Sequence, residues 1–405
     1  MSGAHPLLSF KFRASSLKFS PSRNLELQTL NLKLETTSDE RVRRYNRTRR
    51  YLSLAGFLLS LAWLGALLFL GWSAGLRDVA WHVSARYSLA LAVYLLLVFA
   101  GGKLLGLPLD FYAAYVIEHR YGLSNQAVGG WAKDQAKSVL LGGALSLAAA
   151  ELVYALIRWR PDWWWLAAWA GFLLFVVLLA NLAPVLLFPL FYKFQPLADE
   201  ELKQRLLRLS ERAGARVRGV FEWKLSEKSR KVNAALAGWG NTRRIILSDT
   251  LLEKCTPDEI EAVLAHELAH HVHNHIGKSL ALEAAAGLAG FWLAGRALET
   301  FGSHPRLGFR GIADFANLPL LLLLVAALSL LLLPAANSIS RYFERQADDY
   351  ALGAIRDAGA FISSMEKLAA QNLAERRPNR VIEFIFHSHP SIEKRIRRAL
   401  AHGNS

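Results

Sequence analysis

Long apolar stretches separated by basic segments are the feature of this sequence that most limits its fold. An α-helix rises about 1.5 Å per residue, so about 20 apolar residues are needed to cross the hydrocarbon core of a bilayer. The stretch at 279–300 is the weakest candidate, because it is rich in Ala and Gly and contains Glu283; its alternative is a buried helix of a soluble domain. Six stretches are long enough: 51–73, 87–107, 138–157, 163–192, 279–300 and 316–336.

The composition agrees with lipid as the main solvent of this chain. Hydrophobic residues make up 53% of its 405 residues and charged residues 20%, with a net charge of +15. A basic protein that binds nucleic acid normally carries more charge and fewer apolar residues, so we expect no nucleic-acid partner. The single cysteine, Cys255, excludes an intramolecular disulfide and a cysteine-based zinc cluster, so any metal must be held by histidine and carboxylate.

The basic residues predict how the chain is oriented. Short cytoplasmic flanks of membrane spans are enriched in Lys and Arg, and the segment before the first stretch is rich in arginine, whereas 74–86 contains only Arg77 and Arg86. We therefore expect the N-terminus, 108–137, 193–278 and 337–405 on the cytoplasmic side. The membrane would be the plasma membrane in a bacterium and the endoplasmic reticulum in a eukaryote.

The apolar stretches divide the chain into five regions. Within the cytoplasmic part between the fourth and fifth stretches, the pattern predicts a helix over 199–214, strands at 216–223, 231–237 and 244–248, and a turn at 238–242. The five regions are a polar N-terminal tail without a cleaved leader (1–50), four membrane helices with the loop 108–137 (51–192), a cytoplasmic catalytic region (193–278), two membrane helices (279–336) and a C-terminal catalytic region (337–405).

A helix beginning near Thr256 carries the first chemical motif, A-H-E-L-A-H at 265–270. His266 and His270 are four residues apart and share a helix face, so both imidazoles can reach one metal ion. Glu267 is turned about 100° from His266 and can address water at that ion. The motif is typical of zinc metalloproteases; solvated helix histidines near a membrane surface are the alternative.

A third ligand is expected from the segment after the sixth apolar stretch. The pattern H-E-x-x-H-x-x-G-x-x-H would require a histidine at position 276, which is Ile276. Glu344 follows the end of the apolar stretch by about two turns and can complete a His–His–Glu set. Asp348 lies four residues further on the same face, where it can accept the second N–H of a ligating histidine. Two ordinary surface acids are the alternative.

Several motifs together make the chain resemble the integral-membrane CaaX prenyl endopeptidases, zinc metallopeptidases that remove the last three residues of prenylated proteins. Their order and spacing agree from about residue 40 to residue 400. The motifs are H-E-L-x-H-x-x-x-x-H (266–275), N-x-x-S-R-x-x-E-x-x-A-D (337–348), H-S-H-P-S-I-E-K-R-I (387–396), Y-V-I-E-H-R-Y-G-L-S (115–124), W-A-K-D-Q-A-K (131–137) and V-N-A-A-L-A-G (232–238).

The resemblance implies a mainly α, multi-pass membrane fold with a gluzincin-like zinc-protease core and a small β-hairpin or sheet on the cytoplasmic side. Family members typically have seven spans, against the six expected here. The resemblance also implies one zinc ion per chain and a role for each matching residue. These residues are the zinc ligands His266, His270 and Glu344, the general base Glu267, the supporting pair Asp348 and Arg395, the substrate-facing His389, and Asn233 on an edge strand with Ala234 and Ala235, which would hold the substrate backbone.

The resulting hypothesis is an integral-membrane zinc metalloendopeptidase acting at the cytoplasmic face on a peptide or protein that carries a prenylated C-terminus. The alternative within the same class is a quality-control protease for membrane proteins that needs no prenyl group. A metal-binding scaffold without turnover is a third hypothesis, which Glu267 disfavours because a structural site has no use for a base beside an open position. A binder of anionic lipid or nucleic acid is a fourth, and the basic clusters beside membrane exits fit lipid headgroups better.

Overall fold

The computed structural model describes residues 21–238, 242–355 and 357–402, without the side chains of 21–38. Residues 45–405 form one packed unit, and the contacts described below lie within it. The main elements are α1 (Pro21–Phe69), α2 (Trp72–Val83), α3 (Tyr87–Phe111), α4 (Ile117–Arg120), α5 (Val128–Trp159), α6 (Trp164–Leu182), α7 (Phe188–Phe191), β1 (Phe194–Pro196), α8 (Glu200–Arg212), β2 (Val220–Trp223), β3 (Ala234–Ala237), β4 (Arg244–Ser248), α9 (Asp249–Lys254), α10 (Pro257–Val272), α11 (His275–Phe301), α12 (Leu318–Ala354), α13 (Ala358–Asn372), α14 (Arg380–Phe386) and α15 (Ile392–His402).

Five helical segments in the described part of the chain are long and apolar enough to cross a membrane. They confirm five of the six predicted stretches and the mainly helical, multi-pass fold class. Two short π-helical segments, Tyr112–Val116 and Ala183–Leu187, interrupt the second and fourth of them. The five segments are Asp39–Phe69, Tyr87–Arg120, Val128–Trp159, Trp164–Phe191 and Phe315–Ala354.

The predicted span at 279–300 is not among these five segments. The residues do form a helix, α11, which is rich in Ala and Gly and contains Glu283. Its small residues instead provide a packing surface for α6: Trp169 lies against Gly287 and donates its indole N–H to the carbonyl oxygen of Ala284 at 2.9 Å. The helix therefore lies against a membrane span through close packing rather than through a strongly apolar surface.

The N-terminal region differs from the expected polar tail. Residues 21–50 are helical and continue without a break into the first membrane segment as part of α1. The segment 74–86, expected as a loop, also contains most of α2. Residues 1–20 of the predicted tail lie outside the described residues.

A four-stranded sheet occupies the region between α7 and α9, with the order β1-β2-β4-β3. The three predicted strands are present, and the short β1 is an addition that the apolar pattern did not indicate. Strands β2 and β4 pair in parallel, whereas β3 pairs antiparallel with β4, so β3 forms one edge of the sheet. Gly238 ends β3 with φ +95°, and a Cβ there would lie 2.7 Å from the carbonyl oxygen of Thr242, so only glycine suits this position.

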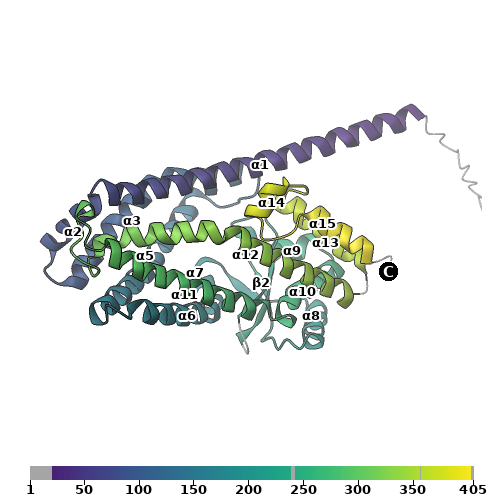
Figure 1. Cartoon of the computed structure of the whole chain (residues 1–405). Helices are drawn as coiled ribbons and strands as arrows, with labels where there is room; N and C mark the ends of the chain where they lie inside the picture. The colour runs from purple at the N-terminus through teal and green to yellow at the C-terminus, as the bar shows by residue number, and fades with distance from the viewer. Residues whose placement is uncertain (1–20, 239–241, 356, 403–405) are drawn as a thin grey trace, which may run out of the picture. The chain divides into compact units, whose positions relative to one another are not determined.

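Two large clusters of buried apolar side chains stabilise this unit. One cluster joins the sheet to the helices around it, with Leu247 of β4, Leu268 of α10 and Phe361 of α13 fully buried. The other lies among the membrane helices and includes Tyr94 and Tyr154. Figure 1 shows α13, α14 and α15 (yellow) beside the C-terminal half of α12, which connects the two clusters.

Segments that lie far apart in the sequence meet at one end of the membrane helices. Residues 123–125 pair with 228–230 through backbone hydrogen bonds. Lys231 forms an ion pair with Glu118 at 2.8 Å, and Arg50 forms one with Glu375 at 2.7 Å. These contacts bring the flank of the first span, the loop 108–137, the sheet region and the C-terminal region together, as the predicted topology requires.

Glu259 anchors the N-terminus of α10 to α13. Its carboxylate accepts hydrogen bonds from the backbone N–H of Thr256, the hydroxyl of Ser363 and the ammonium group of Lys367, at 2.6 to 2.7 Å. Thr256 caps the same helix end, which completes a capping box. Burial by itself raises the pKa of the Glu259 carboxyl, but these contacts outweigh it and hold the pKa below its ordinary value.

We expect Glu259→Gln to lower the melting temperature of the detergent-solubilised protein at pH 7. Since folding lowers the pKa of this carboxyl, its ionised form stabilises the fold above the unfolded-state pKa of about 4.3, and that stabilisation is lost as the pH falls through the folded-state value. The difference in melting temperature should therefore shrink as the pH is lowered below about 4. Glu253→Gln, on the exposed surface of α9, is the control; a difference that stays constant down to pH 3 would contradict this role.

Candidate active site

Helix α10 presents the H-E-x-x-H motif from a fixed position. Its capping box, the Pro257 at its first position and the acids in its first turn explain why the helix begins where the sequence predicts. Leu264, Ala265, Leu268 and Ala269 are buried, so the helix cannot rotate without exposing the apolar face on which it packs. His266 is buried as well, while Glu267 and His270 are half-buried.

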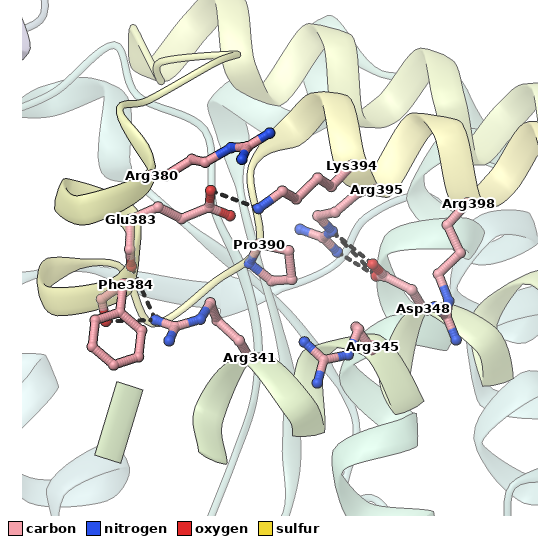
Figure 2. Close-up of a pocket in the computed structure, with 10 residues that line it drawn as sticks. All are labelled: Arg341, Arg345, Asp348, Arg380, Glu383, Phe384, Pro390, Lys394, Arg395 and Arg398. Carbon is pink, nitrogen blue, oxygen red and sulfur yellow. Dashed lines mark hydrogen bonds and ion pairs between the residues drawn. The ribbon is translucent and has the colours of Figure 1, made fainter. Parts of the chain in front are cut away.

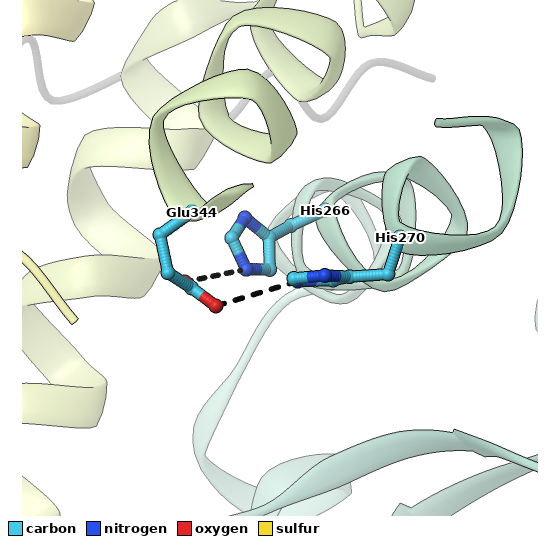
Figure 3. A group of neighbouring side chains, drawn as sticks. All are labelled: His266, His270 and Glu344. Atoms are coloured by element: carbon cyan, nitrogen blue, oxygen red, sulfur yellow. Dashed lines mark ion pairs between the residues drawn. The ribbon is translucent and has the colours of Figure 1, made fainter. Parts of the chain in front are cut away.

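Helix α12 supplies the third side chain of the group. One carboxylate oxygen of Glu344 lies 3.2 Å from Nε2 of His266, and the other lies 3.4 Å from Nε2 of His270. One ligand atom from each of the three residues lies within 4.8 Å of the other two. Figure 3 shows the carboxylate directed between the two imidazole rings. The structure therefore brings His266, His270 and Glu344 together, as the sequence predicts.

The three side chains have the properties of a metal site. Oε2 of Glu344 is buried and, although it lies 3.2 Å from Nε2 of His266, makes no well-aligned hydrogen bond with the residues that the structure describes. An unpartnered buried carboxylate oxygen costs free energy unless a cation or donor satisfies it. Two imidazole nitrogens and one carboxylate that face a common point leave room for a further ligand, as in catalytic metal sites. The residues present thus fit the metal that the motif implies.

Asp348 and Arg395 lie behind His266. Asp348 is only 1% exposed and contacts Nδ1 of His266 at 3.0 Å. Arg395, from α15, donates to both oxygens of this carboxylate at 2.6 and 2.9 Å and so neutralises its charge. Burial by itself lowers the pKa of His266, but its contacts with Asp348 and Glu344 raise the pKa to about 9. The two acids therefore stabilise positive charge in this part of the site, including that of a bound cation.

His270 has a second partner that the sequence analysis did not assign. Nδ1 of His275 lies 3.1 Å from Nδ1 of His270, and Nε2 of His275 lies 3.1 Å from the amide oxygen of Gln346. Because that amide oxygen can only accept, Nε2 of His275 donates, and its Nδ1 accepts the proton on Nδ1 of His270. This arrangement leaves the lone pair of His270 on Nε2, toward Glu344. Burial lowers the pKa of His270 to about 4, which keeps that lone pair free at neutral pH.

The sequence carried a signal for this contact. His275 ends the H-E-L-x-H-x-x-x-x-H motif, but a continuous helix would direct it away from His270. In the structure α10 ends at Val272, and Asn274 adopts a left-handed conformation with φ 52° before α11 begins. This break turns His275 back toward His270. Recognising it from the sequence would have required the position of that break.

A cleft of about 470 Å³ opens beside the three side chains. Glu267, His270 and Glu344 line it, and so do Val176 and Ala180 from the membrane helix α6. Glu267 is also hydrogen-bonded to the backbone of Leu236 in β3, and burial raises the pKa of its carboxyl. An acid with a raised pKa next to a metal site is suited to accept and return a proton near neutral pH.

The remaining predicted residues occupy two sides of this cleft region. Ala234 and Ala235 lie on the edge strand β3, and Asn233 directly precedes it. The backbone of Asn233 is hydrogen-bonded to Ser248, while its side chain is exposed. His389 is exposed as well, and its Nε2 lies 3.3 Å from Oε1 of Glu344. The structure therefore places His389 beside the three-residue group and Asn233 at the end of the edge strand.

Fold and site together define a multi-pass membrane metallopeptidase. Two matches to known families cover most of the chain: residues 196–402 match peptidase family M48, and residues 28–193 match the N-terminal region of CAAX prenyl proteases, described as five membrane helices. Within 28–193, four of the candidate spans of the described chain are present. The chain belongs to peptidase family M48, and the resemblance found in the sequence is confirmed.

Individual relatives agree with this assignment. An uncharacterized metalloprotease of Bacillus subtilis, YhfN, is 34% identical over 298 residues, which cover 73% of this chain and 70% of the relative. A CAAX prenyl protease 1 homolog of Arabidopsis thaliana is 29% identical over 306 residues, or 74% of this chain and 71% of the relative. The crystal structure of S. mikatae Ste24p aligns with a TM-score of 0.80 and 25% identity, covering 90% of this chain and 88% of that one. The protein is therefore an integral-membrane metalloendopeptidase that acts on peptides or proteins.

We expect His275→Phe to lower the metal affinity of the protein by about 10- to 100-fold, because His270 loses the acceptor that fixes its tautomer. The ring of His275 stacks on that of Phe343, with the two ring centroids 4.3 Å apart, and a phenyl ring at position 275 can keep this stacking. Affinity would be measured with a competing chelator on the purified full-length protein. His273→Phe is the matched control and should leave the affinity unchanged; equal affinities of all three proteins would show that His275 does not position His270.

Proposed function

We propose that this protein is a zinc endopeptidase that cleaves near the prenylated C-terminus of its substrates on the cytoplasmic side of the membrane. The observation that carries the proposal is the convergence of His266, His270 and Glu344 on one point, with Glu267 lining the same cleft. Two imidazoles and one carboxylate are a common ligand set of catalytic zinc sites. The acid beside them is not a ligand and can act on water at the metal. The names of the relatives, CAAX prenyl proteases, support the choice of substrate.

The chain's own residues provide the steps of peptide hydrolysis. When bound by His266, His270 and Glu344, zinc would lower the pKa of water at the site and polarise the substrate carbonyl. Glu267 accepts the proton of the attacking water and returns it to the departing amine nitrogen. His389, 3.3 Å from Glu344, donates to the carbonyl oxygen as negative charge develops on it. Arg395 and Asp348 hold the ring of His266 in one orientation.

The edge strand gives the substrate a defined direction. One side of β3 is paired with β4, and the other side is a sheet edge to which an extended peptide can be added. Because Leu236 of this strand is hydrogen-bonded to Glu267, a peptide added to the edge passes close to the proposed base. Asn233, at the beginning of the strand, is placed to bind the peptide backbone with its exposed amide. Ala234 and Ala235 leave space for the substrate side chains.

The cleft borders the membrane helices, which suits a lipid-modified substrate. Val176, Val177 and Ala180 of α6 line it together with Ile276 and Leu280 of α11. A prenyl group that follows this apolar wall can stay in contact with the bilayer while the peptide reaches Glu267. The arginines before the first span favour the cytoplasmic side for this end of the protein.

We expect Glu267→Gln to reduce peptide cleavage by about 10²- to 10⁴-fold, because glutamine keeps the shape of the side chain but cannot accept a proton. Bound zinc, measured on the purified protein by elemental analysis, should remain as in the parent, since Glu267 is not among the proposed ligands. Asp258→Asn, which alters an exposed acid in the first turn of the same helix, is the control for activity. Loss of zinc from Glu267→Gln would assign this residue a different role.

The substrate proposal is tested with two peptides of identical sequence, one farnesylated near its C-terminus and one not. Without a chelator, the parent should release the C-terminal tripeptide from the farnesylated peptide only. With a chelator, it should cleave neither peptide. Products are identified by mass. Equal cleavage of both peptides would exclude the requirement for a prenyl group, and cleavage that resists the chelator would exclude the metal mechanism.

A further inference from the structure

A second cavity, of about 340 Å³, lies on a different face of α12 from the cleft. Arg341, Arg345 and Asp348 of α12 line it, whereas Ser340, Phe343 and Glu344 line the cleft. The two sets of lining residues have no member in common among the described residues, and the Asp348–Arg395 pair belongs to this second cavity. The second cavity is therefore distinct from the cleft in its lining, although Asp348 connects it to the metal site through His266.

The cavity is strongly basic. Six of its lining residues are cationic and only two, Asp348 and Glu383, are acidic. Arg395 is paired with Asp348, and Lys394 with Glu383. Arg345, from α12, and Arg380, from α14, form no hydrogen bond or ion pair with the other lining residues that Figure 2 draws, and Arg345 lies over the ring of Tyr342. The cavity thus offers two arginines without a counter-ion among these lining residues, and guanidinium groups bind phosphate oxygens through paired N–H donors.

Helix α14 exposes apolar side chains next to these arginines, and Phe384 among them lines the cavity. Val381, Phe384 and Phe386 are 64%, 54% and 59% exposed. Arg341 fixes this helix by donating to the carbonyl oxygens of Glu383, Phe384 and His387. Two large aromatic rings exposed on one short helix cost free energy in water, and an apolar environment around them removes this cost.

The position of α14 along α12 identifies that environment. Asn337, which directly follows the apolar stretch of α12, donates from its side-chain amide to the carbonyl oxygen of Ile385 at 2.6 Å. On another side, Glu375 is paired with Arg50, and the next residue of α1, Tyr51, is 66% exposed within a candidate span. Helix α14 therefore lies at the depth where two spans leave the bilayer, which is the interfacial layer that exposed aromatic side chains prefer.

We propose that this cavity binds the phosphate headgroup of an anionic phospholipid, with the apolar side chains of α14 inserted among its acyl chains. Arg345 and Arg380 hold the phosphate, and Phe384 contacts the lipid beside it. A free phosphate ion would use the same arginines but would leave the apolar side chains of α14 without a function. The lipid thus accounts for both halves of this surface, which we call the α14 lipid site.

Native mass spectrometry of the full-length protein in detergent tests the proposal. The protein is titrated separately with dioleoyl phosphatidylglycerol, dioleoyl phosphatidylcholine and inorganic phosphate. The parent should retain phosphatidylglycerol more tightly than phosphatidylcholine, and Arg345→Gln/Arg380→Gln should weaken this retention by at least about tenfold, as expected for the loss of charge-assisted hydrogen bonds. Arg208→Gln/Arg216→Gln removes the same charge from exposed positions near α8 and should bind the lipid as the parent does.

Because the exchanged side chains are exposed, we expect the parent and the variants to have equal melting temperatures. Equal values would exclude a folding defect as the cause of weaker lipid binding. Phe384→Ser should weaken the binding of phosphatidylglycerol and leave that of inorganic phosphate unchanged. If the Arg345/Arg380 variant retains phosphatidylglycerol as the parent does, the cavity is not a lipid site. If inorganic phosphate binds as tightly as the lipid and displaces it, the site serves a soluble anion and the proposal fails.

Discussion

The packing of α10 against the part of α12 that follows its apolar stretch is the contact on which the active site depends. One helix contributes two histidines and the other the carboxylate that meets them, and neither can form the site alone. The apolar face of α10 fixes its rotation, and the membrane-embedded half of α12 fixes its direction. A buried carboxylate oxygen without a hydrogen-bond partner is tolerated between them because the site is built for a cation.

Each histidine of the site is oriented by its own set of polar groups. His266 faces the carboxylate of Asp348, whose charge Arg395 balances from α15, while His270 donates to His275, which is held by Gln346. Asp348 and Glu344 raise the pKa of His266 despite its burial, whereas burial lowers the pKa of His270. Arg395 also ties the C-terminal region to α12, so the last helix of the chain supports the chemistry without lining the cleft.

Helix α12 serves two surfaces at once. One face, with Glu344, borders the cleft that reaches the membrane helix α6, and another, with Arg345, borders the basic cavity under α14. Both surfaces lie just beyond the apolar stretch of the helix, at the depth of lipid headgroups. For an enzyme of the membrane this position is useful, because molecules held at the membrane surface can reach both sides of the helix.

Local patterns in the sequence predict three features of this protein. The length of the apolar stretches predicts the membrane helices, and a capping box predicts the start of α10. The i, i+4 spacing of His266 and His270 predicts which residues could meet at the site. The sequence also predicted a span at 279–300, which forms the helix α11, and the close packing of Gly287 and Gly295 in this helix against the tryptophans of α6 became visible only in the structure. Three features were visible only in the tertiary structure: the parallel pairing of β2 with β4, the turn of His275 toward His270, and the gathering of basic side chains from α12, α14 and α15 around one cavity. These features depend on which distant segments pack together and on where a helix breaks, and no local pattern in the chain encodes either.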